Sequence, residues 1–196
     1  MTDQPDLAAL IASRICHDLI SPLGAIGNGV ELLAMERAGP ELDLLSESVA
    51  HANARIRLFR ISFGAAGADQ RIARSEIAQI LADLSRGGRV AFEWTSASDL
   101  PRREVRLACL LLHCLETALA YGGRVHVEEA DESWTIRAEA PRLRADPDLW
   151  ALVEGAPLPS GLAASQIQFA LAARDLKSLG RKIAIDIGAT GISLTF

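Results

Sequence analysis

The stretch SRICHDLISPLGAIGNGVELL, Ser13 to Leu33, predicts a long amphipathic helix. Its apolar residues recur at alternating spacings of four and three, the heptad pattern of a helix that packs along another helix. The positions of this seam are Ala12, Cys16, Leu19, Leu23, Ile26, Val30 and Leu33. Pro22 lies inside the helix, where it removes one backbone hydrogen bond and is expected to bend the helix one turn after His17.

A second helix is predicted directly after Gly39 and Pro40, because proline suits the first turn of a helix. Its seam runs through Leu42, Leu45, Val49, Ala52, Ile56, Phe59 and Phe63, and Gly64 ends it. The two arms, each roughly 45 Å long at about 1.5 Å per residue, form a hairpin with an apolar face that lacks a partner. We expect two copies to pair as a four-helix bundle with two-fold symmetry. The alternative is a hairpin that folds back on the rest of its own chain.

The motif HDLISPL, His17 to Leu23, carries the candidate chemistry. His17 lies one residue beyond a seam position, so it is predicted to face solvent. Neutral imidazole is a nucleophile, and Asp18 can hold one ring nitrogen while the other attacks a phosphoryl group. Ser21, one turn further on, can hydrogen-bond the imidazole or the phosphoryl oxygens. Arg14 can neutralise phosphoryl charge; the alternative for Arg14 is a solvated arginine.

Composition excludes several classes of protein. The chain has 196 residues, of which 49% are hydrophobic, and a net charge of -5. This length suits one domain or two small ones, and the acidic balance argues against nucleic-acid binding. The most apolar stretch, Leu107 to Ala120, is too short to span a bilayer. We therefore expect a cytoplasmic protein without membrane contact, in which the cysteines are core residues rather than metal ligands; these are Cys16, Cys109 and Cys114.

A change of pattern near residues 65 to 70, AAGADQ, divides the chain. Residues 1–66 are predicted to form the helical hairpin and residues 70–196 a mixed α/β domain. The helices expected there are Arg74–Arg86, Arg102–Tyr121, Ala145–Leu152 and Gly161–Leu179, and the strands are Arg89–Trp94, Arg124–Glu128, Ser133–Glu139, Arg181–Ile187 and Gly191–Phe196. The fold class is therefore α+β, a hairpin followed by an α/β sandwich with helices on one face of a mixed sheet.

The stretch Ser13 to Leu33 closely resembles the ChpT-type histidine phosphotransferases of alphaproteobacterial phosphorelays, and HDLISPL is more distantly similar to the histidine box of sensor histidine kinases. The second half resembles the kinase ATP-binding domain in layout. The resemblance implies that His17 is phosphorylated, that Asp18 orients it and that Ser21 is the polar residue one turn on. It also implies that the chain carries phosphoryl groups between receiver domains of a hybrid histidine kinase and of response regulators, which supply the Mg²⁺.

The chain departs from the kinases at the nucleotide site. LLHCLETALAY, Leu111 to Tyr121, has the apolar frame of the kinase asparagine box, but His113 and Thr117 stand where asparagines would serve Mg²⁺. The segment AEAPRLRADPD has no Asp-X-Gly-X-Gly loop, and GAPLPSG, Gly155 to Gly161, has two prolines where a lid needs glycines. We expect a domain that keeps the fold, binds no cofactor and does not use ATP. His113 is expected on a helix face, without a metal.

Receiver docking is expected on the bundle just below His17, where glycines permit close approach. The candidate residues are Ile20, Gly24, Gly27, Asn28, Arg60 and Phe63. Because Phe63 is also a seam residue, bundle core is the alternative for it. Two other functions stay open at this point, a divergent sensor-type histidine kinase and a non-catalytic scaffold that binds receivers.

Overall fold

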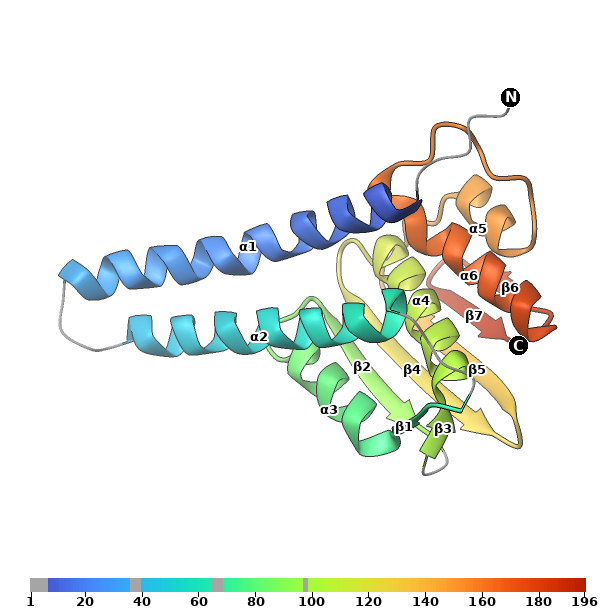
Figure 1. Cartoon of the computed structure of the whole chain (residues 1–196), viewed down its shortest axis with the longest axis horizontal. Helices are drawn as coiled ribbons and strands as arrows, with labels where there is room; N and C mark the ends of the chain where they lie inside the picture. The colour runs from blue at the N-terminus through green and yellow to red at the C-terminus, as the bar shows by residue number, and fades with distance from the viewer. Residues whose placement is uncertain (1–6, 36–39, 65–68, 97–98) are drawn as a thin grey trace.

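The computed structural model describes residues 7–35, 40–64, 69–96 and 99–196, and the side chains of Cys16, His17 and Ile20 lie outside the described part. Two long helices project side by side from an α/β domain (Figure 1). In chain order the elements are α1 (Leu7–Met35), α2 (Pro40–Phe63), β1 (Arg71–Ala73), α3 (Arg74–Ser85), β2 (Val90–Thr95), β3 (Asp99–Pro101), α4 (Arg102–Ala118), β4 (Gly123–Ala130), β5 (Ser133–Glu139), α5 (Pro147–Val153), the 3₁₀ turn η1 (Ala164–Gln166), α6 (Ile167–Leu179), β6 (Ala184–Ile187) and β7 (Gly191–Thr195). The predicted fold class is confirmed.

The main sheet has five strands in the order β2-β4-β5-β7-β6, and β1 pairs with β3 as a separate ribbon. Strand β2 runs parallel to β4, while the other neighbours are antiparallel. Side chains alternate between the faces, as in β5, where Trp134, Ile136 and Ala138 are buried and Arg137 and Glu139 are exposed. Helices α3, α4 and α6 cover the buried face, so the sheet is a two-layer sandwich (Figure 1).

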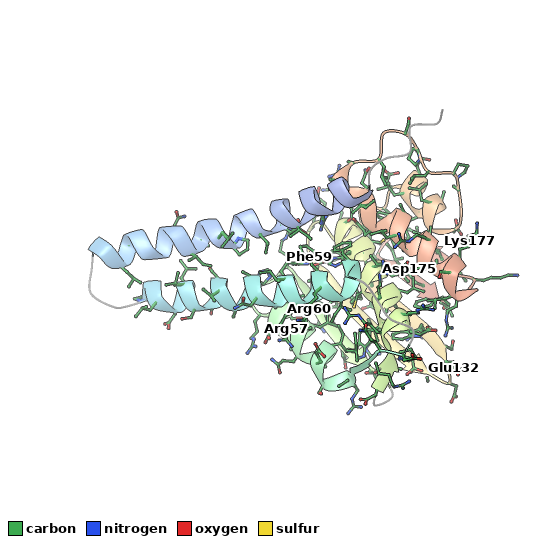
Figure 2. All side chains as sticks on the ribbon, in the orientation of Figure 1. Arg57, Phe59, Arg60, Glu132, Asp175 and Lys177 are labelled. Carbon is green, nitrogen blue, oxygen red and sulfur yellow. The ribbon has the colours of Figure 1, made fainter. Side chains whose placement is uncertain are left out.

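Helix α4 is the centre of the core. Every residue from Leu107 to Leu115 is buried, as expected for a helix that is enclosed on several sides. The sheet lies behind it, α6 lies along one flank, and the last turns of α2 lie across it (Figure 1). Phe59 of α2 lies at this junction (Figure 2), and its ring centroid is 5.4 Å from that of His113.

The base of the hairpin joins the core of the α/β domain. Ala54, Leu58 and Ile61 of α2 belong to the same buried apolar cluster as α4 and the sheet. Two arginines of α4 also hold the end of α2: Arg102 donates to the Arg60 carbonyl and Arg106 to the Ser62 carbonyl, each at 3.0 Å. The bond to Ser62 satisfies a carbonyl in the last turn of the helix, and the bond to Arg60 adds a second donor to a carbonyl that also accepts from the Gly64 nitrogen at 3.2 Å. Residues 65–68 of the predicted linker lie outside the described part, so the domain division at 66–70 stays a prediction.

Several element boundaries differ from the sequence predictions. The long helix expected from Gly161 begins only at Ile167, because Ala163 is extended and the Gln166 side chain accepts a hydrogen bond from its backbone nitrogen at 3.1 Å. Helix α5 begins at Pro147, where the Asp146 side chain accepts from the backbone nitrogen of Asp148 at 3.0 Å. The short strands β1 and β3 were not predicted, because three residues are too few for a visible alternation.

Candidate functional site

Two of the predicted site residues form an ion pair on α1. Arg14 and Asp18 are one turn apart, and their Nη2 and Oδ2 atoms lie 2.7 Å apart with 13% of each side chain exposed. Arg14 Nη1 also donates to the Ser165 carbonyl at 3.2 Å, so it links α1 to η1 in the α/β domain. Because a carboxylate accepts at both oxygens, this pair is compatible with Asp18 also orienting His17.

A cleft of about 1150 Å³ lies between the hairpin and the α/β domain. Its hairpin wall includes Arg14, Asp18 and Ser21 of α1 and the face of α2 between Leu44 and Arg55. The opposite wall comprises the turn after α3 from Arg86 to Arg89, the last turns of α4, and the segments 144–149 and 165–166. The structure therefore brings three of the four predicted catalytic residues to a single cleft. The side chain of the fourth, His17, lies outside the described part.

The docking residues predicted on α1 lie on the neighbouring face of that helix. At about 100° per residue, His17, Gly24 and Asn28 share one face, and Ser21 lies between this face and the cleft. Gly24, Gly27 and Asn28 are exposed, and a Cβ on either glycine would meet nothing within 4 Å. Their own chain therefore does not require glycine there. Ile20 falls on the same face, but its side chain is outside the described part.

The two docking residues predicted on α2 lie at the base of the hairpin. Arg60, which Figure 2 shows on the last turn of α2, pairs with Glu76 at 3.7 Å, and 67% of its side chain is exposed. Phe63 is half-buried and stacks on His113 with ring centroids 5.5 Å apart. Neither residue lines the cleft. Their contribution to docking stays a prediction.

Sequence reasoning missed His51, which lies on α2 and lines the same cleft. Burial and the nearby Arg55 lower the pKa of its imidazole, and Glu116 opposes them. His51 is therefore neutral at physiological pH, as a nucleophile would be. No motif surrounds it in the sequence, so only the folded arrangement of α1 and α2 reveals its position.

A buried polar network joins α2 to α4. The side chain of His113 is fully buried, with Nε2 3.2 Å from the Ser62 hydroxyl and Nδ1 3.0 Å from a Glu116 oxygen. Nη1 of Arg55 donates to both oxygens of Glu116 at 2.9 Å. His113 is thus not on an open helix face, because the base of the hairpin covers this side of α4.

The charges in this network follow from burial and pairing. Burial raises the pKa of Glu116, but Arg55 and His113 outweigh burial and lower it to about 2. Burial lowers the pKa of His113. At neutral pH a carboxylate therefore accepts from Nδ1 of a neutral imidazole. Nε2 is then an acceptor, and the single proton of the Ser62 hydroxyl has two acceptors in reach, Nε2 at 3.2 Å from Oγ and the Leu58 carbonyl oxygen at 2.9 Å.

The same network makes folding stability fall on acidification. Below its ordinary pKa of 6.5, His113 takes up a proton more readily in the unfolded chain, and Glu116 does so between 4.5 and about 2. We expect the free energy of unfolding to decrease through both ranges, with Glu116 accounting for on the order of 3 kcal/mol. Urea denaturation at a series of pH values measures this. The Glu116→Gln variant should lack the lower step, and an unchanged profile contradicts the assignment.

The corner of α4 where the sequence resemblance predicts the counterpart of the kinase asparagine box is occupied by the chain itself. Gln168 of α6 is fully buried, and its Nε2 donates to the Thr117 hydroxyl at 3.1 Å and to the Ser165 carbonyl at 2.9 Å. His113 and Thr117, the residues at the asparagine positions, are thus both bonded to protein groups. Among the described residues, no three His, Cys, Asp or Glu side chains come together as a metal site.

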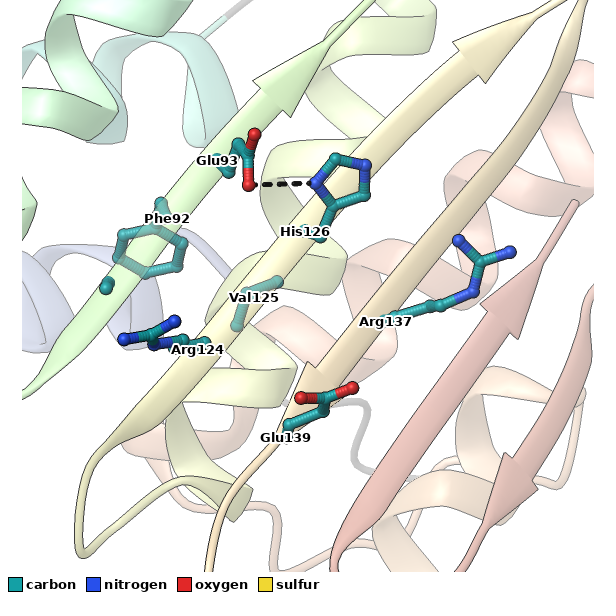
Figure 3. A pocket seen from close by; sticks show the side chains of 8 residues that line it. Phe92, Glu93, Arg124, Val125, His126, Arg137 and Glu139 are labelled. Atoms are coloured by element: carbon teal, nitrogen blue, oxygen red, sulfur yellow. Dashed lines mark ion pairs between the residues drawn. The ribbon is translucent and has the colours of Figure 1, made fainter.

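A second cavity, of about 610 Å³, lies on the open face of the sheet (Figure 3). Charged side chains surround it, including Glu93, Arg124, Arg137 and Glu139, and His126 pairs with Glu93 at 3.3 Å. It belongs to the face opposite the helices and shares no residue with the cleft beside Asp18.

In the described part of the chain, no helix is both long and apolar enough to cross a membrane.

Comparison with known proteins gives the family. Residues 74–191 match the family described as Histidine phosphotransferase C-terminal domain. The chain belongs to the histidine phosphotransferases. It is 34% identical to protein phosphotransferase ChpT of Brucella abortus (strain 2308), over 95% of this chain and 93% of that protein. A solved bacterial phosphotransferase superposes with a TM-score of 0.82 at 33% identity, covering 97% of this chain and 95% of that one.

These comparisons confirm the family and the activity that the sequence predicted. The protein is a histidine phosphotransferase of a two-component phosphorelay. The roles of individual residues, the receivers and the oligomeric state rest on the arguments that follow.

Proposed function

We propose that His17 carries the phosphoryl group, taking it from an aspartyl phosphate on one receiver domain and passing it to an aspartate on a second receiver. The observation that carries this proposal is the placement of Arg14, Asp18 and Ser21 along one wall of a cleft, with His17 on the adjoining face of α1. The receivers proposed are those of a hybrid histidine kinase and of response regulators, and the exchange takes place in the cytoplasm.

For this reaction the chain needs to supply only a nucleophile and the side chains that orient it and the phosphoryl group. A ring nitrogen of neutral His17 attacks phosphorus, an N–P bond forms, and the O–P bond of the acyl phosphate breaks to release the receiver's carboxylate. The second transfer reverses these steps on another aspartate. Asp18 holds the imidazole and Ser21 bonds the phosphoryl oxygens. The receiver brings Mg²⁺, which neutralises most of the developing charge.

Two incubations separate this proposal from its alternatives, one with labelled ATP alone and one with a receiver that carries labelled phosphate on its aspartate. A phosphotransferase becomes labelled only through the receiver. A divergent histidine kinase becomes labelled by ATP alone, and a non-catalytic scaffold is labelled in neither case.

We expect no tight binding of nucleotide. Thr117 is bonded to Gln168 and His113 to Ser62 and Glu116, so the groups that would meet Mg²⁺ and phosphate are engaged within the chain. Titration calorimetry with ATP or ADP and Mg²⁺ should show a Kd weaker than about 1 mM, less than ~4 kcal/mol of binding free energy. A micromolar Kd favours the kinase instead.

The receiver domain is proposed to dock on the glycine face of α1, the exposed surface that includes Gly24, Gly27 and Asn28. A glycine inside a helix costs about 0.5–1 kcal/mol relative to alanine, and nothing in the described chain requires it at Gly24 or Gly27. Close approach of a partner explains both residues.

Substitution of these glycines tests the docking face. Gly24→Leu should raise the KM for a phosphorylated receiver by roughly tenfold, since a side chain then separates the surfaces, while the free energy of unfolding does not fall. Ala50→Leu, at an exposed position of α2, is the matched control and should leave KM unchanged. If Gly24→Leu changes the oligomeric state and not the KM, this face belongs to a dimer and the docking proposal is wrong.

A homodimer through the hairpin completes the proposal. Leu42, Val49 and Ile56 of α2 are spaced by seven residues, so they form a single stripe, and each is 39% to 47% exposed. On α1, Leu23 is 58% exposed. A second copy of the same hairpin offers a matching stripe by two-fold symmetry, which is how such arms commonly bury it.

A further inference from the structure

Helix α4 uses three polar side chains to hold neighbouring helices. His113, Glu116 and Thr117 lie within about one turn of each other, and their partners are Ser62, Arg55 and Gln168 respectively. Two of these partners, Ser62 and Arg55, belong to α2 of the hairpin that carries the phosphotransfer motif. Helix α4 therefore holds the base of the hairpin through His113 and Glu116.

We propose that Glu116 is a positioning residue for phosphotransfer: by holding Arg55, it fixes the hairpin in one orientation against the α/β domain, so that a receiver meets both walls of the cleft at once. This inference rests on the proposed function, because it takes His17 as the carrier, and it extends the docking surface from the glycine face of α1 to the adjoining cleft. It goes beyond that function by assigning the α/β domain a task in the reaction.

The geometry of the Arg55–Glu116 pair supports this role. Nη1 of Arg55 is 2.9 Å from both carboxylate oxygens, and the two side chains are 15% and 16% exposed. A buried, hydrogen-bonded ion pair favours one relative position of the two helices that carry it. Removal of one partner leaves the other charge without a counter-charge in a region with little water. Among the described residues, the other ion pair between hairpin and domain is Arg60–Glu76, which is long and largely exposed and so contributes little.

The position of the pair couples it to the site. Arg55 and Glu116 line the cleft together with Asp18 and Ser21. The apolar base of α2 holds the hairpin on the domain but specifies its orientation less sharply than polar bonds do, because apolar attraction is not directional. Hydrogen bonds with preferred angles restrict that orientation further. Two of them join residues that line the cleft, Arg14 with the Ser165 carbonyl and Arg55 with Glu116, and of these the bond to Glu116 is the shorter and reaches both carboxylate oxygens.

A second buried pair provides the matched control. Glu104, also on α4, pairs with Arg181 at 2.9 Å, and these side chains are 17% and 22% exposed. Both residues belong to the α/β domain, so Glu104→Gln removes a comparable ion pair without touching the hairpin. Any effect of Glu116→Gln that Glu104→Gln shares is therefore one of general stability.

The experiment measures orientation and kinetics in the full-length chain. Spin labels on cysteines introduced at the exposed positions Ala50 and Ala91 report the distance between hairpin and domain by pulsed EPR, with Cys16 replaced by serine and labelled chains diluted in unlabelled protein. In parallel, KM and kcat are measured for transfer from a phosphorylated receiver, and the rate of modification is measured with phosphoramidate, a small donor that needs no docking.

We expect Glu116→Gln to broaden the distance distribution and to raise the receiver KM about tenfold, with kcat within about twofold and a much smaller effect on the phosphoramidate reaction. Arg55→Gln should act alike, and the double variant should be no worse than either single one, because one interaction is removed in all three. Glu104→Gln should keep the wild-type distances and KM.

Three results overturn the proposal: wild-type distances in Glu116→Gln, additive effects of the two single variants, or an equal KM change in Glu104→Gln. The distance measurement does not depend on His17. If the proposed function fails and His17→Ala still accepts phosphate, the distances still show whether Glu116 holds the hairpin.

Discussion

Replacing His17 with alanine is expected to abolish phosphoryl acceptance, lowering the rate of transfer from a phosphorylated receiver by at least about a thousandfold. The chain has 4 histidines. His113 is fully buried, and His126 lies on the far face of the sheet, paired with Glu93. His51 lines the cleft, and no acid follows it directly in the chain as Asp18 follows His17. Loss of His17 therefore leaves no equivalent nucleophile.

The control for this experiment is His51→Ala, which removes the other histidine of the cleft. That variant should accept phosphate at the wild-type rate, whereas His17→Ala should keep the wild-type melting temperature and oligomeric state while remaining unlabelled. Phosphate on histidine is labile to acid, so acid and base treatment of the labelled protein identifies the bond. Acid-labile phosphate on the His17→Ala variant contradicts the assignment.

The pattern of the sequence predicted the architecture because the architecture depends on local periodicity. The seams of α1 and α2, the alternation in β5 and the glycine after α6 are visible in short windows. Gly180 ends α6 with a φ of 67°, and the predicted stop is found there. Where a side chain decides a boundary, as Gln166 does before α6, periodicity gives the wrong start.

The joint between hairpin and domain could not be predicted in the same way. Arg55 and Glu116 are 61 residues apart in the chain, and nothing near either residue indicates the other. His113 illustrates the difficulty, since an isolated histidine on a helix gives no sign of being covered by Ser62 and Phe63. The cleft forms only when α1 and α2 pack against the α/β domain. The residues of its second wall could therefore not be predicted from the sequence.

The exposed fractions of the side chains divide the predicted seam of α2 into a buried set and an exposed set. Ala52 and Phe59 are buried within one chain, but Val49 and Ile56 stay 39% and 47% exposed. Half of the predicted seam of α2 therefore packs within the chain, and the other half forms the stripe that the proposed dimer uses. Heptad spacing alone does not separate these two faces, because the exposed and the buried residues each recur every seven positions and only together give intervals of three and four.

The largest effect on assembly is expected from Val49→Asp and Ile56→Asp, which should convert the proposed homodimer into a monomer. Each substitution removes roughly 1.5 kcal/mol or more of apolar burial and places a charge in the stripe. By two-fold symmetry each change occurs twice in the interface, so a single substitution costs at least ~3 kcal/mol and weakens the dimer at least ~100-fold. Light scattering coupled to gel filtration, at micromolar protein, measures the mass.

Ala50→Asp is the matched control, since Ala50 is exposed next to Val49 but lies off the stripe; this variant should remain a dimer. Circular dichroism distinguishes a folded monomer from an unfolded chain in the aspartate variants. The apolar base of α2 is buried within one chain at Ala54, Leu58 and Ile61, so we expect the α/β domain to stay folded when the bundle separates. A wild-type chain that is already a folded monomer at micromolar concentration contradicts the dimer, and with it a two-fold arrangement of phosphotransfer sites.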